Sequence, residues 1–220
     1  EPSSSPSGAP SAVPSSQPSG EPSSFPTGSP TDTPTSPSSA PTKLLEWSQL
    51  GVDIDGDVTG DNCGSDVSLS SDGSLMAVGS KLSDVSGADA GEVRVFEYDA
   101  GTDSWTQKGS SIYGEAAGDR SGSAVSLSGD GSRVAIGADR NDAVGANAGH
   151  VRVFEYSSGS GDWSQVGADL DGEASIDLSG RSVSLSEDGS RVAIGANHND
   201  GGGSSSGHVR VYEYSAGVDS

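Results

Sequence analysis

The stretch VSLSGDGSRVAIGADRNDAVGANAGHVRVFEY, residues 125–156, decides the fold, because it recurs without a gap at residues 67–98 and 183–214. A tryptophan precedes each copy, and Trp47, Trp105 and Trp163 share one spacing (105 − 47 and 163 − 105, 58 in both cases). A fixed period of this length is typical of a repeat architecture.

Each repeat contains four short strand patterns, which in the first copy cover residues 67–70, 75–79, 93–98 and 105–109. The second is almost continuously apolar, which predicts burial on both faces, and the fourth is the most polar, as at an outer edge. Asp72-Gly73 lies between the first two strands and predicts a tight type I′ hairpin, whose two central residues need a positive φ.

Four antiparallel strands that change from apolar to polar describe one blade of a β-propeller, whose faces are covered by its neighbours. We therefore predict an all-β fold, a partial propeller of about three four-stranded blades within residues 43–220. The repeat units are residues 47–104, 105–162 and 163–220. A parallel β-helix is the alternative, but its shorter coils would not place a tight hairpin in each unit.

The repeats are out of phase with the predicted blades, since residues 47–54 read as a fourth strand and the chain stops after a third. About three blades are fewer than the roughly 4–8 of known propellers. Either the natural chain continues with further blades, or a second copy completes the ring. We favour continuation, because the next residue would be the next tryptophan.

Residues 1–42 have a different composition, with all 11 prolines in a PSxx or PTxx pattern. Such a tract cannot bury an apolar core, so we predict a disordered, extended Pro/Ser/Thr-rich stalk or linker. Its density of Ser and Thr beside Pro is typical of O-glycosylated stalks.

The charge of the chain is strongly acidic, at −21. Repulsion from phosphates and anionic lipids argues against nucleic acid and membrane-surface partners. We also expect no membrane insertion, since no apolar run approaches 18 residues. The single cysteine, Cys63, has Ser121 and Ser179 as counterparts and does not define a redox compartment.

The pattern GxxxDxxGxxVSLSxDGSxxAIGA…GHVRVFEY resembles the FG-GAP repeat of integrin-alpha-like β-propellers over about residues 47–220. The matching residues of the second copy are Gly114, Asp119, Gly122, Val125, Ile136, Gly137, Ala138, Gly149 and Val151 to Phe154. With the PSxx tract in front, the chain is similar to stalked surface proteins of some microalgae. The resemblance implies a secreted or cell-surface protein.

The chain departs from that family where the family binds calcium. The name-giving Phe is replaced by Cys63, Ser121 or Ser179, and the calcium loop is shortened to Ser-x-Asp-Gly-Ser. One Asp per turn cannot supply the six or more oxygens that Ca²⁺ prefers, so the family's cation site is not carried over. Asp53, Asp55 and Asp57 form a more metal-like run, whose second-copy counterpart contains Ser111, Tyr113 and Glu115.

Two families of loops should lie on one face of the ring and carry equivalent aspartates. The fourth-to-first connections contain Asp61, Asp119 and Asp177, and the second-to-third connections contain Asp84, Asp142 and Asp200. Carboxylates from neighbouring blades could hold Ca²⁺ or a polar ligand. The other interpretation is that they cap turns.

No group of residues indicates catalysis. His150, His198 and His208 are dispersed and expected to be exposed, and Gly203-Ser-Ser-Ser-Gly207 lacks the strand–turn–helix context of a nucleophile elbow. We therefore expect a non-enzymatic, extracellular or cell-surface adhesion module without a cofactor, whose loop face contacts a protein or a glycan. A structural matrix or cell-wall component without a ligand pocket is the alternative, and Ca²⁺ stays open as a ligand.

Overall fold

The computed structural model describes residues 46–215, and these residues form a partial β-propeller of three antiparallel sheets. Within that range there is no helix, and hence none long and apolar enough to cross a bilayer. The predicted stalk, residues 1–42, lies outside the described residues, so that prediction and the predicted domain limits stay untested.

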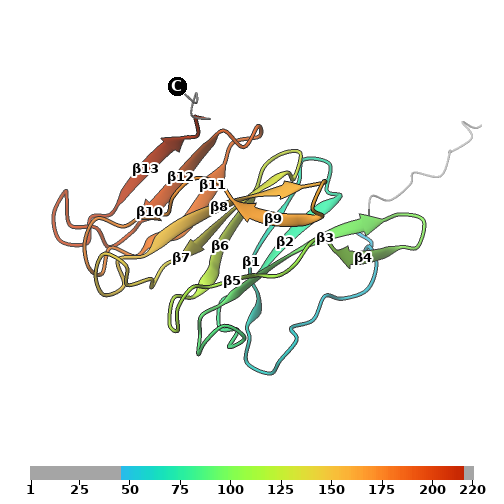
Figure 1. The fold of residues 1–220 in the computed structure, drawn as a ribbon, viewed down its shortest axis with the longest axis horizontal. Coiled ribbons are helices and arrows are strands. Elements are labelled where there is room, and N and C mark those ends of the chain that lie inside the picture. The colour runs from blue at the N-terminus through green and yellow to red at the C-terminus, as the bar shows by residue number, and fades with distance from the viewer. Residues whose placement is uncertain (1–45, 216–220) are drawn as a thin grey trace, which may run out of the picture. The chain divides into compact units, whose positions relative to one another are not determined.

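Each sheet is one blade, and the three blades stand side by side (Figure 1). Blade A contains β1 (Cys63–Leu69), β2 (Leu75–Ser80), β3 (Glu92–Asp99), β4 (Ser104–Gln107) and β5 (Ile112–Tyr113). Blade B contains β6 (Ser121–Leu127), β7 (Arg133–Ala138), β8 (His150–Ser157), β9 (Asp162–Gln165) and β10 (Leu170–Asp171). Blade C contains β11 (Ser179–Leu185), β12 (Arg191–Ala196) and β13 (His208–Glu213).

The outer strand of each complete blade is split in two. In blade A, β4 pairs with residues 96–99 of β3 and β5 pairs with residues 92–93, both antiparallel. Blade B repeats this arrangement with β9 and β10 on β8. The predicted fourth strand is thus present as β4. The outer edge of the blade then continues with a second short strand, β5, which leads into the next blade.

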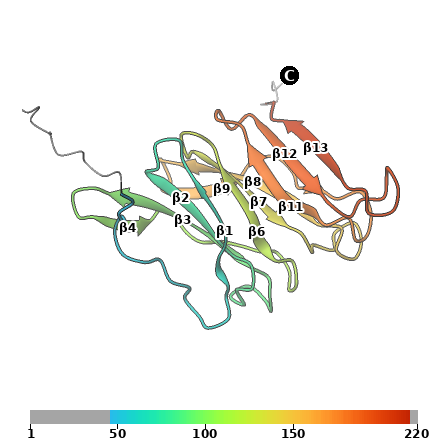
Figure 2. The same cartoon turned by 180° about the vertical axis from the view of Figure 1, so that it is seen from behind.

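The first strands of the three blades lie next to one another, as Figure 2 shows for β1, β6 and β11. Side chains of one strand accept hydrogen bonds from the amides of the next. Asp66 Oδ2 accepts from Val125 N at 2.8 Å, and Ser68 Oγ accepts from Leu127 N at 3.0 Å. These bonds satisfy amides on the free edge of β6, which no neighbouring strand pairs.

The core lies between the blades rather than within one blade. Val93 and Val95 of blade A pack against Val125 and Ile136 of blade B, and all are at most 4% exposed. A second cluster joins Val151 of blade B to blade C. Each blade therefore depends on its neighbour to bury its apolar side chains, as the repeat pattern predicted.

Two details of the predicted strands are wrong. Residues 47–54 form no strand, because a fourth strand pairs with the third strand of its own blade and the described residues contain no such partner for this segment. The hairpins are not type I′ turns, because Gly73 has φ 72° while Asp72 stays at negative φ, and the turn bond runs from Gly73 N to Ser70 O. The Asp72 side chain favours this other turn, because its carboxylate accepts hydrogen bonds from Ser70 and Ser74 of the same turn.

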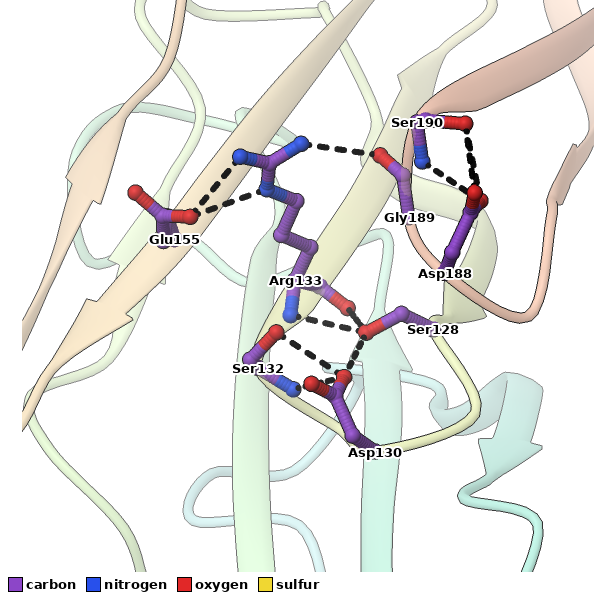
Figure 3. A network of polar contacts seen from close by, with 8 residues as sticks. All are labelled: Ser128, Asp130, Ser132, Arg133, Glu155, Asp188, Gly189 and Ser190. Carbon is purple, nitrogen blue, oxygen red and sulfur yellow. Dashed lines mark hydrogen bonds and ion pairs between the residues drawn. The ribbon is translucent and has the colours of Figure 1, made fainter.

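The Ser-x-Asp-Gly-Ser turns are held by their aspartates, and Figure 3 shows two of them beside Arg133. In the third copy, Asp188 Oδ1 accepts from Ser186 Oγ at 2.6 Å and from Ser190 N at 3.0 Å. These bonds lower the pKa of Asp188 from 3.8 to about 2, with the Ser186 hydroxyl as the largest cause. The pKa of Asp72 is likewise lowered to about 2, chiefly by the Ser74 amide.

We expect these turns to weaken in acid. A folded-state pKa below the unfolded value means that the stabilising bonds are fully present above about pH 4 and are lost as the pH falls through about 2. Carboxyl titration by NMR should show Asp188 with a midpoint near 2, and Ser186→Ala should raise that midpoint toward 3.8, the ordinary value. An unchanged midpoint in Ser186→Ala would contradict this account.

Candidate functional site

An arginine of each third strand joins its blade to the segment that leads into that blade. Arg94 Nη2 donates to Asp55 O at 2.7 Å, and Arg152 Nη2 donates to Tyr113 O at 2.7 Å. Arg210 Nη2 makes the equivalent bond to Asp171 O. The guanidinium groups also lie over the aromatic ring two residues along the strand, at 5.4 Å for Arg94 and Phe96.

Beside the Arg152 contact, three side chains that can bind a metal ion converge at the junction of blades A and B. Glu115 lies in the segment between β5 and β6, His150 begins β8, and Asp169 directly precedes β10. One ligand atom of each residue lies within 4.8 Å of the others. The Nδ1 atom of His150 is 3.9 Å from Asp169 Oδ2.

The tertiary structure holds His150 at this place from both sides. It pairs with Ala138 of β7 and with Asp171 of β10, so its backbone is in the middle of blade B. Its side chain is only 1% exposed, whereas the side chains of Glu115 and Asp169 are 45% and 31% exposed. The cluster thus has one buried imidazole and two carboxylates that reach solvent.

The imidazole of His150 lacks a hydrogen-bond partner in the described part of the chain, at Nδ1 and at Nε2 alike. Burial lowers the pKa of His150 below its usual value and Arg152 lowers it further, while Asp169, Glu115 and Asp119 act in the opposite direction. A neutral imidazole keeps a free lone pair, which is the form that binds metal ions. Arg152 Nη1 is 3.4 Å from Glu115 Oε1, so this carboxylate is shared with the arginine.

The other two blades repeat the position of the cluster but not its chemistry. The blade A counterparts are Asp57, Glu92 and Ser111, and Asp57 Oδ1 instead accepts a bond from Arg94 at 2.9 Å. In blade C, His208 Nδ1 is 3.6 Å from Glu173 Oε2, and the described residues add no third ligand to this pair. Within residues 46–215, blade B alone brings all three ligands together.

The run proposed as a metal site, Asp53, Asp55 and Asp57, is exposed, and the carboxylates of Asp53 and Asp57 have different partners. Asp53 Oδ1 accepts from Gln49 Nε2 at 2.8 Å, and Asp57 is bound by Arg94. The structure does not group these three carboxylates with one another. Their use as metal ligands stays a prediction.

The two families of loop aspartates lie in different environments. Asp61, Asp119 and Asp177 are 3–4% exposed, and each accepts a backbone N–H from three residues earlier in its loop. Asp119 and Asp177 also accept from the buried amides of Asn141 and Asn199, which joins the two loops of a blade. A ligand role for these aspartates stays untested.

Asp84, Asp142 and Asp200 are exposed and accept a backbone N–H from five residues further along, at 2.7, 2.7 and 2.6 Å. They cap the long loops between the second and third strands. Their carboxylates are free to contact solvent, so a ligand role for them also stays a prediction.

Sequence reasoning missed the cluster because it treated the histidines as exposed and dispersed. His150 is in fact buried. One signal was present in the sequence, since Glu115 is the counterpart of Asp57, a member of the metal-like run Asp53, Asp55 and Asp57. Glu115, His150 and Asp169 are far apart in sequence, and the pairing of β8 with β10 is needed to bring them together.

No family model matches the chain, and no curated protein matches its sequence. Similar solved structures include a candidate 6-phosphogluconolactonase from Bacteroides uniformis, at 17% identity over 68% of this chain and 35% of that one, with a TM-score of 0.44. A second from Bacteroides fragilis has 16% identity over 68% and 34%, with a TM-score of 0.44. The periplasmic gluconolactonase of Pseudomonas aeruginosa has 17% identity over 67% and 38%, with the same TM-score.

These comparisons correct four expectations. The resemblance to FG-GAP, integrin-alpha-like repeats is wrong, since no family model matches and the similar propellers carry gluconolactonase names. For the same reason the adhesion function, its structural-matrix alternative and the expectation of a non-enzymatic protein are withdrawn. The word periplasmic describes the Pseudomonas protein, and an extracellular or cell-surface location of this chain stays a prediction.

The similarity to these structures is low in identity and covers only part of their length. The chain spans about a third of the length of these structures, at identities of 16–17%. Their reactions are therefore not transferred to it. The comparisons agree with the observed sheets on one property, the all-β propeller architecture of the chain.

Proposed function

We propose that the chain binds a divalent transition-metal ion, of which Zn²⁺ is the probe, through Glu115, His150 and Asp169 at the junction of blades A and B. The observation that carries the proposal is His150. Its side chain is 1% exposed, yet neither ring nitrogen has a hydrogen-bond partner among the described residues. Burying an imidazole without a partner costs free energy, and coordination would remove that cost.

The set of ligands favours a transition metal over calcium. An imidazole with two carboxylates suits Zn²⁺ and its neighbours in the first transition row, whereas Ca²⁺ takes 6–8 oxygen ligands. The three side chains offer one imidazole nitrogen and the oxygens of two carboxylates. The Ca²⁺ considered from the sequence fits these residues less well.

The arrangement leaves room for a further ligand. Three protein ligands with an open fourth position are the pattern of zinc sites that hold a water molecule or a substrate oxygen. Glu115 and Asp169 have side chains that are 45% and 31% exposed, so the solvent side of the cluster is accessible. Glu115 comes from the segment that leaves blade A, so shared coordination would also tie that segment to blade B.

Arg152 does not prevent this use of Glu115. Its Nη2 atom keeps the 2.7 Å bond to Tyr113 O, and its Nη1 atom is 3.4 Å from Glu115, which is longer than a strong charge-assisted bond. A small rotation of the half-exposed glutamate can therefore exchange the arginine for an ion without breaking the backbone contact.

Titration calorimetry with Zn²⁺, Mn²⁺, Ca²⁺ and Mg²⁺ tests the proposal, in a Cys63→Ser background because a free thiol also binds zinc. We expect one equivalent of Zn²⁺ to bind, and His150→Gln, Asp169→Asn or Glu115→Gln to weaken binding by ~100-fold, at the upper end of the losses seen when even outer-shell partners of a metal are removed. Co²⁺ absorption gives a second readout of the ligand field.

The matched control is His208→Gln, which removes the equivalent histidine of blade C, where Glu173 is its one carboxylate neighbour among residues 46–215. This variant should bind Zn²⁺ as the parent does. Equal losses in His150→Gln and His208→Gln, or no Zn²⁺ binding by the parent, would contradict the proposal. Asp169→Asn covers the case in which the buried His150 variant does not fold, since Asp169 is partly exposed.

A further inference from the structure

A cavity of ≈ 210 Å³ opens at the junction of blades A and B, the junction that also holds the metal cluster. It is smaller than the pockets of about 300–1,000 Å³ that take drug-sized ligands, so it suits a molecule of one small ring. Both blades at this junction have all five of their strands. The walls combine hydroxyl, charged and aromatic side chains, among them Ser110, Tyr113, Arg152, Phe154, Asp162 and Trp163.

The guanidinium group of Arg152 connects this cavity to the metal cluster. Arg152 lines the cavity, and its Nη1 atom is 3.4 Å from Glu115 Oε1, a carboxylate of the cluster. The same guanidinium lies over the Phe154 ring, 5.3 Å from its centroid, and Phe154 also lines the cavity. His150, Arg152 and Phe154 occupy every second position of β8, so their side chains share one face of the blade.

The charges at this place favour an anion once a metal ion is bound. Glu115 and Asp169 contribute −1 each, Arg152 contributes +1, and His150 binds metal as the neutral imidazole. The group therefore carries −1 without the ion (−2 + 1) and +1 with a divalent ion (−2 + 1 + 2). Arg152 is 6% exposed, so its charge is screened less than that of a surface arginine. A carboxylate should bind here only when the metal is present.

A second wall of the cavity can accept hydroxyl groups. Asp162 Oδ1 accepts from Ser110 N and Trp163 N at 2.9 Å, whereas Oδ2 accepts from Ser110 Oγ at 3.2 Å and keeps lone pairs for a ligand. The Ser110 amide is the largest cause that lowers the pKa of Asp162. Ser110 binds this wall, and Tyr113 O binds Arg152 at 2.7 Å. These two residues are three positions apart, at most ~11 Å, so one small molecule can reach both groups.

Tyr113 gives the cavity an exposed aromatic ring, and the other copies of the repeat lack it. Its side chain is 39% exposed, and its counterparts are Asp55 and Asp171. The partly buried Trp163 adds a second ring to the walls. Apolar surface with a few polar groups is the usual composition of a small-molecule site. Among the described blades, the complete metal cluster and this tyrosine occur together at the same junction.

We propose that this cavity binds a small carboxylic acid that carries hydroxyl groups, such as a sugar acid, next to the metal ion. The inference rests on the metal site proposed above. The carboxylate lies between the ion and Arg152, a hydroxyl group donates to Asp162, and the carbon skeleton packs against Tyr113 and Trp163. Because the ion and the acid meet in one site, each raises the affinity for the other by the same factor.

Titration calorimetry with D-galacturonate tests the proposal, on the 220-residue chain with Cys63→Ser, both loaded with Zn²⁺ and stripped of metal by EDTA. We expect saturable binding to the loaded chain and about 10–100-fold weaker binding to the stripped chain, as for the loss of a charged hydrogen-bonding partner. Zn²⁺ should in turn bind more tightly by the same factor when D-galacturonate is present. A titration without protein gives the heat of zinc chelation in solution, which is subtracted.

Two further probes separate the two ends of the ligand. D-Galactose lacks the carboxylate and should show no saturable binding, and cyclohexanecarboxylate lacks the hydroxyl groups and should bind about 10-fold more weakly than D-galacturonate. Asp162→Asn should weaken D-galacturonate by about 10-fold and leave cyclohexanecarboxylate unchanged. A purely structural role of Asp162 would weaken both acids equally, and that result would overturn its assignment.

Arg152→Met should weaken D-galacturonate by about 10–100-fold, because it removes the charged donor. The matched control is Arg94→Met, since Arg94 is the equivalent arginine of blade A, where it binds Asp55 O. This control should bind D-galacturonate as the parent does. Tyr113→Ala covers the case in which the buried Arg152 variant does not fold, because the Tyr113 side chain is partly exposed and its carbonyl is kept. It should weaken D-galacturonate by about 10-fold.

The outcomes separate this inference from the metal proposal. A chain that binds Zn²⁺ but not D-galacturonate would overturn the inference and leave the metal site intact. Equal binding of D-galacturonate with and without Zn²⁺, or equal losses in Arg152→Met and Arg94→Met, would also overturn it. A chain that binds no Zn²⁺ would overturn both proposals.

Discussion

Replacing Gly149 with alanine should lower the free energy of unfolding by about 4 kcal/mol, close to the largest effects known for single substitutions. Gly149 has φ 74°, which costs an alanine about 1–2 kcal/mol. A Cβ at this position would also be 2.1 Å from Ser179 O and 2.8 Å from Ser179 N. The bridge between Gly149 and Ser179, which joins blades B and C, would therefore have to open.

Gly161→Ala is the matched control for this variant. Its φ is 72°, nearly that of Gly149, but a Cβ there meets nothing within 4 Å. Urea denaturation should show a loss of about 1–2 kcal/mol for the control, due to backbone strain alone. Similar losses in the two variants would mean that the close approach of the blades at Ser179 is not tight.

Replacing Asp119 with alanine should cost about 3 kcal/mol, because it leaves buried donors without an acceptor. Asp119 is 3% exposed, and its Oδ2 atom accepts from Ala116 N and from Asn141 Nδ2, both at 3.0 Å. Asn141 is itself 6% exposed and cannot turn to water. The loss should appear as a lower urea midpoint with an unchanged slope.

Asp142→Ala provides the comparison, since Asp142 is exposed and accepts one backbone N–H, from Asn147 at 2.7 Å. We expect it to cost about 1 kcal/mol, the usual net value of one hydrogen bond. If Asp119→Ala were as mild as Asp142→Ala, the buried aspartates would not be the joints between loops that their contacts indicate. That result would favour the predicted ligand role of these aspartates.

The strands were predictable because their signal is local and repeated three times. Val93-Arg-Val-Phe-Glu-Tyr98 alternates with a period of two, and the predicted 93–98 became Glu92–Asp99. The apolar run of the second strand likewise became Leu75–Ser80. Comparing copies at the 58-residue spacing also predicted that blades need neighbours, which the mixed cores confirm.

The errors arose where a residue's state depends on something distant. Trp47-Ser-Gln has nearly the same sequence as Trp105-Thr-Gln, yet one is strand and the other is not, because only the second has a third strand beside it. The type I′ turn was wrong because the Asp72 carboxylate binds Ser70 and Ser74 and favours another turn. His150 was taken as exposed because its burial depends on β10, 20 residues further along.

The sequence alone determined the period, the strands and the dependence of each blade on the next, since these follow from apolar alternation within a few residues of chain. Tertiary structure decided where the chemistry lies. Glu115, His150 and Asp169 meet because β5 of one blade leads past the third strand of the next, and Trp47 is exposed because its segment pairs with no third strand among the described residues. Burial and side-chain convergence are properties of packed surfaces, and a repeated sequence cannot show which of its equal positions will be covered.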